Sequence, residues 1–332
     1  MASIQKFIPN SAAKSDHPAR NPGMDLDLDL VKDQLVNKSA VERRAATLTT
    51  RRSVKKANQA AWYLKAVTCI DLTTLSGDDT PDRVRRLCAK ARMPVRSDLL
   101  ESMGMPDRNI TVGAVCVYHE MVKTAVEALD GSGIPVAAVS TGFPAGQSPF
   151  DLKVKEIEKS VRAGAAEIDI VISRRHVLTG NWRALYKEIV AYRAACGDAH
   201  LKTILATGEL GNLRNVAAAS MVAMMAGADF IKTSTGKESV NATLPVSLSM
   251  VRMIRTYKEM TGYNVGFKPA GGVSKAKDAL AYQILMKEEL GNAWLQPDLF
   301  RFGASSLLGD IERQLEHFVT GRYSAGNRHP VG

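Results

Sequence analysis

Short runs of apolar and β-branched residues recur from residue 66 onward, and each is followed by small or polar residues and then by a stretch with helical spacing. Such runs are typical of strands buried on both faces, as parallel strands are. The intervening stretches are long enough for crossover helices. The pattern therefore predicts eight parallel strands, over residues 66–71, 113–117, 136–139, 166–172, 201–205, 230–232, 265–268 and 300–303.

Two folds accommodate this βα alternation. An open, doubly wound sheet usually carries a glycine fingerprint after its first strand, and the stretch CIDLTTLSG supplies none. A closed barrel of 250 residues or more is commonly a single domain. We therefore expect a TIM (β/α)8 barrel, with the open sheet as the alternative.

The N-terminal part differs from the barrel region in pattern and charge. Residues 1–30 combine Pro9, Pro18, Pro22 and Gly23 with an Asp-Leu repeat, which predicts a mobile arm, and residues 31–64 have a charged helical pattern. Residues 1–58 hold eleven Lys or Arg against six Asp or Glu, half of the net charge of +10. We expect a basic arm and helical extension over 1–58, a catalytic barrel over 59–323 and a tail over 324–332.

Composition restricts the function classes. The hydrophobic content of 45% and charged content of 23% are typical of a soluble globular protein. No apolar run approaches membrane-spanning length and no secretory signal is evident, so a cytoplasmic location without a membrane partner is expected. The basic charge lacks zinc-finger spacing or interleaved aromatic residues, which argues against a nucleic-acid partner. Scattered cysteines and histidines predict reduced thiols and no metal site.

Active sites of β/α barrels lie at the C-terminal ends of the strands. In this chain those positions carry chemically active side chains, namely Asp71, Cys116, Asp169, Lys232, Lys268, Ser305 and Ser306.

Lys232 and Lys268 both stand within apolar strands. Burial lowers the pKa of a lysine, and a second lysine facing the same pocket lowers it further, which leaves a free amine able to add to a carbonyl. The sequence therefore indicates Schiff-base chemistry. Asp169, in EIDIVI, could shuttle protons beside that amine. The alternative for these residues is a set of ion pairs that only stabilises the barrel.

Glycine-rich stretches at residues 233–237 and 271–272 expose backbone N–H groups that could hold phosphate oxygens, with the hydroxyls of Ser305 and Ser306 nearby. The loops after the seventh and eighth strands form the common phosphate site of this fold. Taken singly, each glycine could serve only a turn. ATP binding is not indicated, because STGK lacks the first glycine of a P-loop, where Ile231 stands.

Six motifs together resemble the deoxyribose-phosphate aldolase family over residues 62–323: ADFIKTSTGK, VGFKPAGGV, FGASSLL, EIDIVI, AVCVY and CIDLTTL. The resemblance implies a class I aldolase of deoxyribonucleoside catabolism. Such an enzyme reversibly cleaves 2-deoxy-D-ribose 5-phosphate to D-glyceraldehyde 3-phosphate and acetaldehyde through a lysine Schiff base, without a metal or dissociable cofactor. The long N-terminal region and LATGELG resemble the eukaryotic branch.

The resemblance also implies roles for individual residues. Lys232 would form the Schiff base, Lys268 would lower its pKa and relay protons, and Asp169 would shuttle protons. Substrate contacts would come from Asp71, Thr73, Cys116 and Thr235, and phosphate contacts from Gly236, Lys237, Gly271, Gly272, Gly303, Ser305 and Ser306. Bacterial members often end in a tyrosine that reaches the active site, whereas this chain ends HPVG with Tyr323 upstream.

Three other functions fit parts of the sequence. Another Schiff-base barrel enzyme, a transaldolase or ketose-phosphate aldolase, would use the same lysine. A phosphate-binding barrel without catalysis would keep only the glycine-rich loops, and an interaction protein would work through residues 1–58. The expected ligand is a small sugar phosphate, and the sequence is compatible with a homo-oligomer.

Overall fold

Eight parallel strands form the centre of the molecule. The computed structural model describes residues 20–106 and 108–329. Neighbouring strands pair in the order β7-β6-β5-β4-β3-β2-β1-β8. Their bounds are β1 Ile70–Thr73, β2 Ala114–Tyr118, β3 Val136–Ser140, β4 Glu167–Val171, β5 His200–Ile204, β6 Phe230–Lys232, β7 Gly266–Lys268 and β8 Phe302–Ala304.

The sheet closes between β7 and β8. Parallel bridges join Phe267 to Phe300 and Ala270 to Gly303. The Phe267 amide donates to the carbonyl of Leu299 at 2.9 Å, and Gly303 donates to Pro269 at 2.9 Å. The predicted barrel is therefore confirmed, and the open doubly wound sheet is excluded.

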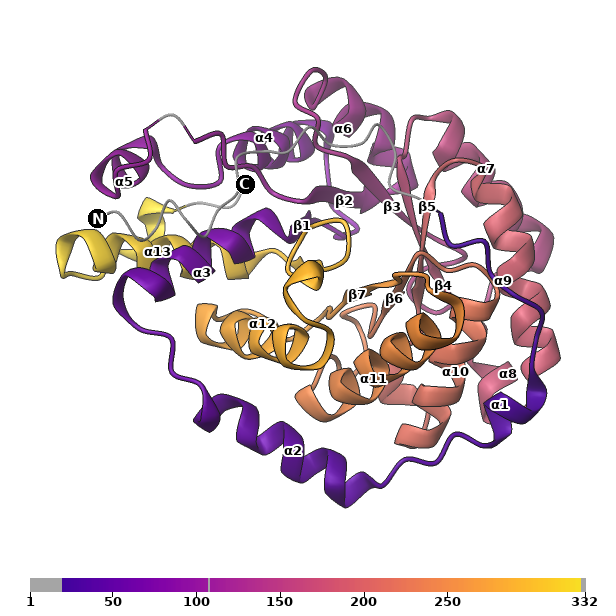
Figure 1. The fold of residues 1–332 in the computed structure, drawn as a ribbon. Coiled ribbons are helices and arrows are strands. Elements are labelled where there is room, and N and C mark those ends of the chain that lie inside the picture. Colours follow the sequence, from indigo (N-terminus) through magenta and orange to yellow (C-terminus); the bar gives the residue numbers. More distant parts are fainter. Residues whose placement is uncertain (1–19, 107, 330–332) are drawn as a thin grey trace.

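Helices surround the barrel (Figure 1) and connect successive strands. Their bounds are α1 Leu28–Lys32, α2 Lys38–Arg51, α3 Lys56–Thr68, α4 Pro81–Arg92, α5 Ser97–Ser102, α6 Val122–Ala128, α7 Phe150–Arg162, α8 Arg174–Leu178, α9 Trp182–Cys196, α10 Leu213–Met225, α11 Leu244–Thr261, α12 Ala276–Leu290 and α13 Ser306–Thr320. No helix of the described residues is long and apolar enough to span a membrane.

The prediction for the first strand was wrong at its start. The expected strand began at residue 66, but α3 continues to Thr68 and β1 begins at Ile70. Ala66 and Val67 extend the buried face that α3 presents through Ala60 and Leu64. An apolar run of this length does not distinguish a buried helix from a strand. The predicted domain boundary at residue 58 also falls inside α3.

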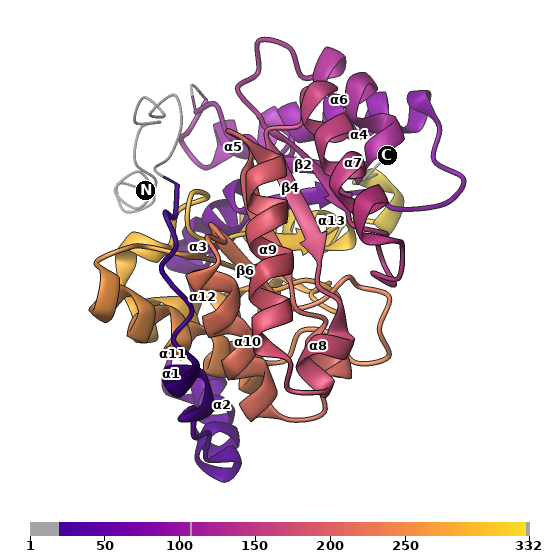
Figure 2. The same ribbon diagram turned by 90° about the vertical axis from the view of Figure 1, so that its right-hand side faces the viewer.

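The expected mobile arm is anchored in the part that the structure describes; residues 1–19 lie outside it. Asn21 is 2% exposed, and its side-chain amide donates to the carbonyls of Met224 at 2.8 Å and Ala228 at 2.9 Å. Figure 2 shows the chain running from there along the side of the barrel to α1. The α2 helix then packs outside α11 and α12, where Arg44 pairs with Glu288 at 2.7 Å. Buried hydrogen bonds therefore hold this segment despite its irregular sequence.

Candidate active site

Two lysines at strand ends meet one aspartate of another strand inside the barrel. Lys232 ends β6 and Lys268 ends β7, and the two residues are paired in register. Asp169 lies in β4. Its Oδ2 atom accepts hydrogen bonds from the Nζ atoms of Lys232 at 2.7 Å and Lys268 at 2.8 Å. The two ammonium positions are therefore no more than 5.5 Å apart, the sum of these distances.

Further charged side chains extend this buried cluster around the two lysines. Lys268 contacts Asp71 at 2.5 Å, and Arg301 pairs with Asp71 at 2.6 Å and with Glu167 at 2.9 Å. Lys202 pairs with Glu167 and lies 3.4 Å from the Asp169 Oδ1 atom. The buried cluster thus holds four basic groups and three carboxylates, Lys202, Lys232, Lys268, Arg301, Asp71, Glu167 and Asp169. It is electrically neutral when one lysine has lost its proton.

The two lysines that share Asp169 differ in acidity. Burial lowers the pKa of Lys232, and the nearby Lys268 cation lowers it further, although Asp169 opposes both. Burial also acts on Lys268, but the Asp169 and Asp71 carboxylates outweigh it and raise the pKa of Lys268 above its ordinary value. Lys232 is therefore the more acidic of the two lysines.

The three carboxylates of the cluster stay ionised. Burial alone would raise their pKa values, but the surrounding cations outweigh it. Lys268 and Arg301 hold the pKa of Asp71 below its usual range, and Arg301 and Lys202 lower the pKa of Glu167. Lys232 and Lys268 hold the pKa of Asp169 well below its usual range.

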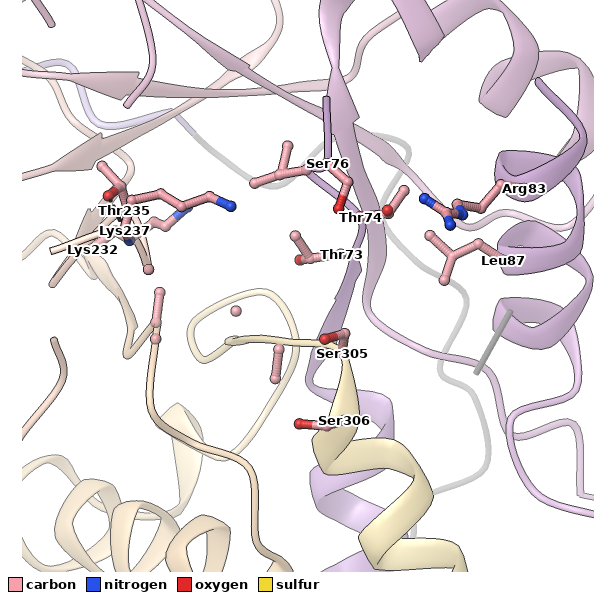
Figure 3. A pocket seen from close by; sticks show the side chains of 16 residues that line it. Thr73, Thr74, Ser76, Arg83, Leu87, Lys232, Thr235, Lys237, Ser305 and Ser306 are labelled. Atoms are coloured by element: carbon pink, nitrogen blue, oxygen red, sulfur yellow. Dashed lines mark hydrogen bonds between the residues drawn. The ribbon is translucent and has the colours of Figure 1, made fainter. Parts of the chain in front are cut away.

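A cavity of about 590 Å³ opens above the cluster. Lys232 reaches it with 3% of its surface exposed, whereas Lys268 is fully buried beneath and does not line it. The expectation that both amines face one pocket is therefore corrected. In Figure 3, Lys232, Thr235 and Lys237 lie on one side of the cavity, and Thr73, Ser305 and Ser306 lie opposite.

Most of the predicted phosphate and substrate residues lie around this cavity. The lining includes Thr73, Thr235, Gly236, Lys237, Gly271, Gly303, Ser305 and Ser306. Strands β1 and β8, and the segments that follow β6, β7 and β8, bring these residues together. Their roles in binding remain predictions.

Three predicted substrate or phosphate residues do not line the cavity. Asp71 is fully buried and bound to Lys268 and Arg301, which makes it part of the charge cluster. Cys116 is buried against Ala137 and Val139, and burial raises the pKa of its thiol. Gly272 also lies outside the lining.

Tyr323 does not take the place of a tyrosine at the active site. Its side chain is 58% exposed and stacks on His317, with ring centroids 4.2 Å apart. The following segment is held by His329, whose Nε2 atom lies 2.8 Å from Glu316. Residues 330–332 lie outside the described residues.

The sequence prediction missed several charged residues of the site. Lys202 is a lysine inside an apolar strand, the same signal that identified Lys232 and Lys268. Glu167 stands two residues before Asp169, so alternation in a strand places both on the same face. Arg301 directly precedes β8, and no pattern in the sequence distinguished its side chain from one facing solvent. Arg83 of α4, which also lines the cavity, carried no signal.

Comparisons with known proteins find similar sequences over most of the chain. A model of the family described as "DeoC/LacD family aldolase" matches residues 65–309. The chain is 61% identical to the deoxyribose-phosphate aldolase of Mus musculus, covering 93% of this chain and 98% of the relative. It is 59% identical to the deoxyribose-phosphate aldolase of Bos taurus, covering 94% and 99%.

A solved structure shows the same fold at lower identity. It is the tetrameric deoxyribose phosphate aldolase of Aeropyrum pernix, with a TM-score of 0.56 and 22% identity. The match covers 84% of this chain and 99% of that one.

Proposed function

The chain belongs to the DeoC/LacD family of aldolases, and on that basis we propose that it reversibly cleaves 2-deoxy-D-ribose 5-phosphate to D-glyceraldehyde 3-phosphate and acetaldehyde. Lys232 forms a Schiff base with the substrate aldehyde. The observation that supports this chemistry is the difference in pKa and burial between Lys232 and Lys268, which both bind the Asp169 Oδ2 atom. Lys232 reaches the cavity and has a lowered pKa, while Lys268 is buried and has a raised one.

The first half of the cycle forms the electron sink. Neutral Lys232 adds to the C1 aldehyde of the open-chain sugar to give a carbinolamine, and loss of water gives the iminium. Asp169 is within hydrogen-bonding distance of this nitrogen, and it moves protons during both steps. The Lys268 cation remains bound to Asp169 throughout and keeps that carboxylate in place.

The second half breaks the carbon–carbon bond. Deprotonation of the C3 hydroxyl breaks the C2–C3 bond, whose electrons pass to the iminium and leave an enamine on Lys232. Glyceraldehyde 3-phosphate departs. Protonation at C2 restores the iminium, and a water molecule then releases acetaldehyde and the free amine, so that the water lost earlier is regained.

The far end of the cavity is suited to the phosphate. Arg83 supplies positive charge there, and Ser305 and Ser306 stand at the start of α13, where helix N–H groups favour an anion. Lys237 adds a second positive charge from the side of the cavity on which Lys232 lies. We expect the sugar chain to extend from Lys232 toward this end.

A substrate panel tests the proposal against its nearest alternatives. We expect turnover of 2-deoxy-D-ribose 5-phosphate, measured by the release of glyceraldehyde 3-phosphate, and little turnover of ketose phosphates. Faster cleavage of a ketose phosphate would favour a transaldolase or ketose-phosphate aldolase. Binding of both sugars without turnover would favour a phosphate-binding barrel.

Several further properties belong to the proposal. We propose a cytosolic enzyme that assembles as a homo-oligomer, as the Aeropyrum pernix protein does. Light scattering of the purified protein gives the assembly state, and cell fractionation gives the location. Deletion of residues 1–19, which lie before the anchored Asn21, tests whether a separate function resides in that part of residues 1–58.

A further inference from the structure

The loop that follows β6 is held from behind by a buried carboxylate. Glu238 is 8% exposed, and its carboxylate accepts hydrogen bonds from the backbone N–H of Thr235 at 3.0 Å and of Gly236 at 3.1 Å. It also accepts one from the Thr235 hydroxyl at 2.8 Å. Three donors of a single turn thus converge on one side chain.

The carboxylate lies on the side of the loop away from the ligand space. Thr235, Gly236 and Lys237 line the cavity, whereas Glu238 does not. The two N–H groups that bind Glu238 are therefore engaged behind the loop. Gly236 has a φ of +88°, a conformation that glycine adopts without strain, so the hydrogen-bonded turn is shaped to direct Lys237 toward the cavity.

Arg174 ties this carboxylate to two other loops of the same rim. Its guanidinium lies 3.7 Å from Glu238 and 2.5 Å from Glu209, in the loop after β5. It also donates to the carbonyls of Pro144 at 3.1 Å and Ala145 at 2.6 Å, in the loop after β3. The support behind the β6 loop is therefore anchored, through Arg174 of α8, to the loops after β3 and β5.

The loop after β6 also packs against Gly271 in the loop after β7. The Asn241 side-chain amide donates to the Glu238 carbonyl at 2.9 Å. A Cβ atom on Gly271 would lie 2.6 Å from the Asn241 side chain, so the β7 loop approaches closely only because residue 271 is a glycine. The backbone at Glu238 is thereby linked through Asn241 to Gly271, a second residue of the cavity lining.

We propose that Glu238 is a positioning residue that sets the preference of this enzyme for a phosphorylated substrate. It holds the β6 loop so that Lys237 meets the phosphate together with Gly271. This inference rests on the proposed function and extends it to a residue that contacts neither the phosphate nor the reacting atoms. Because Glu238 contacts the turn that carries Lys237 and does not contact Lys232, its loss weakens phosphate recognition more than it weakens Schiff-base formation at Lys232.

The test compares Glu238→Ala with Glu259→Ala, a matched control on the exposed face of α11. We expect the dissociation constant for inorganic phosphate, measured by calorimetry, to rise about tenfold in Glu238→Ala alone, because the released β6 loop must then be ordered when the anion binds. The ratio of kcat/KM for 2-deoxyribose 5-phosphate to that for unphosphorylated 2-deoxyribose should fall by a similar factor, mainly through KM.

Trapping with acetaldehyde and borohydride shows whether the variant keeps an intact Lys232 pocket, because acetaldehyde carries no phosphate. The proposal is supported if Glu238→Ala and Glu259→Ala are trapped equally while the dissociation constant for phosphate rises about tenfold only in Glu238→Ala. Unchanged phosphate affinity overturns it, and so does an equal fall of kcat/KM for 2-deoxyribose 5-phosphate and for 2-deoxyribose. If Glu238→Ala does not fold, Glu238→Gln, which keeps one acceptor oxygen, must give an intermediate loss of phosphate affinity, and no loss overturns the proposal. Wild-type protein that binds phosphate but turns over neither sugar would contradict the proposed function and leave the calorimetric comparison decisive for Glu238.

Discussion

Removal of the Lys268 charge should make Lys232 harder to deprotonate. The two nitrogen atoms lie no more than 5.5 Å apart because they share the Asp169 Oδ2 atom. At an effective dielectric constant of about 20, two unit charges at that separation repel each other by about 3 kcal/mol. Lys268→Leu removes this repulsion, and the buried cluster then needs the Lys232 proton to balance its carboxylates. The fraction of neutral Lys232 near pH 7 should fall about 100-fold.

The assay is the pH dependence of kcat/KM for 2-deoxyribose 5-phosphate. Because only neutral Lys232 reacts, Lys268→Leu should shift the acid limb of the profile to higher pH, and activity should recover as the pH rises. Lys268→Arg keeps the charge and should leave the limb in place even if its maximum is lower. Burial is the largest cause of the lowered pKa of Lys232. A limb that stays in place in Lys268→Leu would therefore show that burial alone suffices and would refute the role assigned to Lys268.

Three other substitutions probe neighbouring parts of the account. Under the proposed proton-transfer role of Asp169, the change Asp169→Asn beside Lys232 should lower kcat about 100-fold or more; a loss below tenfold would contradict that role. Arg301→Met leaves Asp71 and Glu167 without a principal cation and should cost about 3–5 kcal/mol in urea unfolding, whereas an unchanged midpoint would show that the pairs contribute nothing. Because the pKa values of these two carboxylates are lowered in the folded protein, they stabilise the fold fully above about pH 5, and this contribution is lost as the pH falls. The loss of stability in acid should therefore be smaller in Arg301→Met. Tyr323→Phe, on an exposed ring, should change kcat/KM by no more than about twofold; a larger loss would place Tyr323 in the reaction.

The barrel could be predicted from the sequence because its strands are buried on both faces. That burial produces continuous apolar runs, and the strands β2 to β7 lie within one or two residues of their predicted bounds. The start of β1 could not be located in this way, since Ala66 and Val67 serve the buried face of a helix. The anchoring of residue 21 also left no periodic signal, because it depends on hydrogen bonds to residues more than 200 positions away.

The meeting of Lys232, Lys268 and Asp169 followed from their places at strand ends. The sequence could not predict which of the two lysines faces the cavity, because this depends on how deep each amine lies within the barrel and on its neighbours. The place of Asp71 depends in the same way on Arg301, whose orientation no motif reveals. The contacts of Glu238 arise from the conformation of a single loop, which hydrophobic patterning does not determine.

Reductive trapping tests the central claim most directly. The protein is incubated with acetaldehyde and sodium borohydride, alongside Lys232→Ala and, as a control, Lys237→Ala, which removes another lysine of the same cavity. Intact mass and peptide mapping should show one ethyl group on Lys232 in the wild-type protein and in Lys237→Ala, and none in Lys232→Ala. An adduct that persists in Lys232→Ala, or none in the wild-type protein, would contradict the assignment of Lys232 as the Schiff-base lysine.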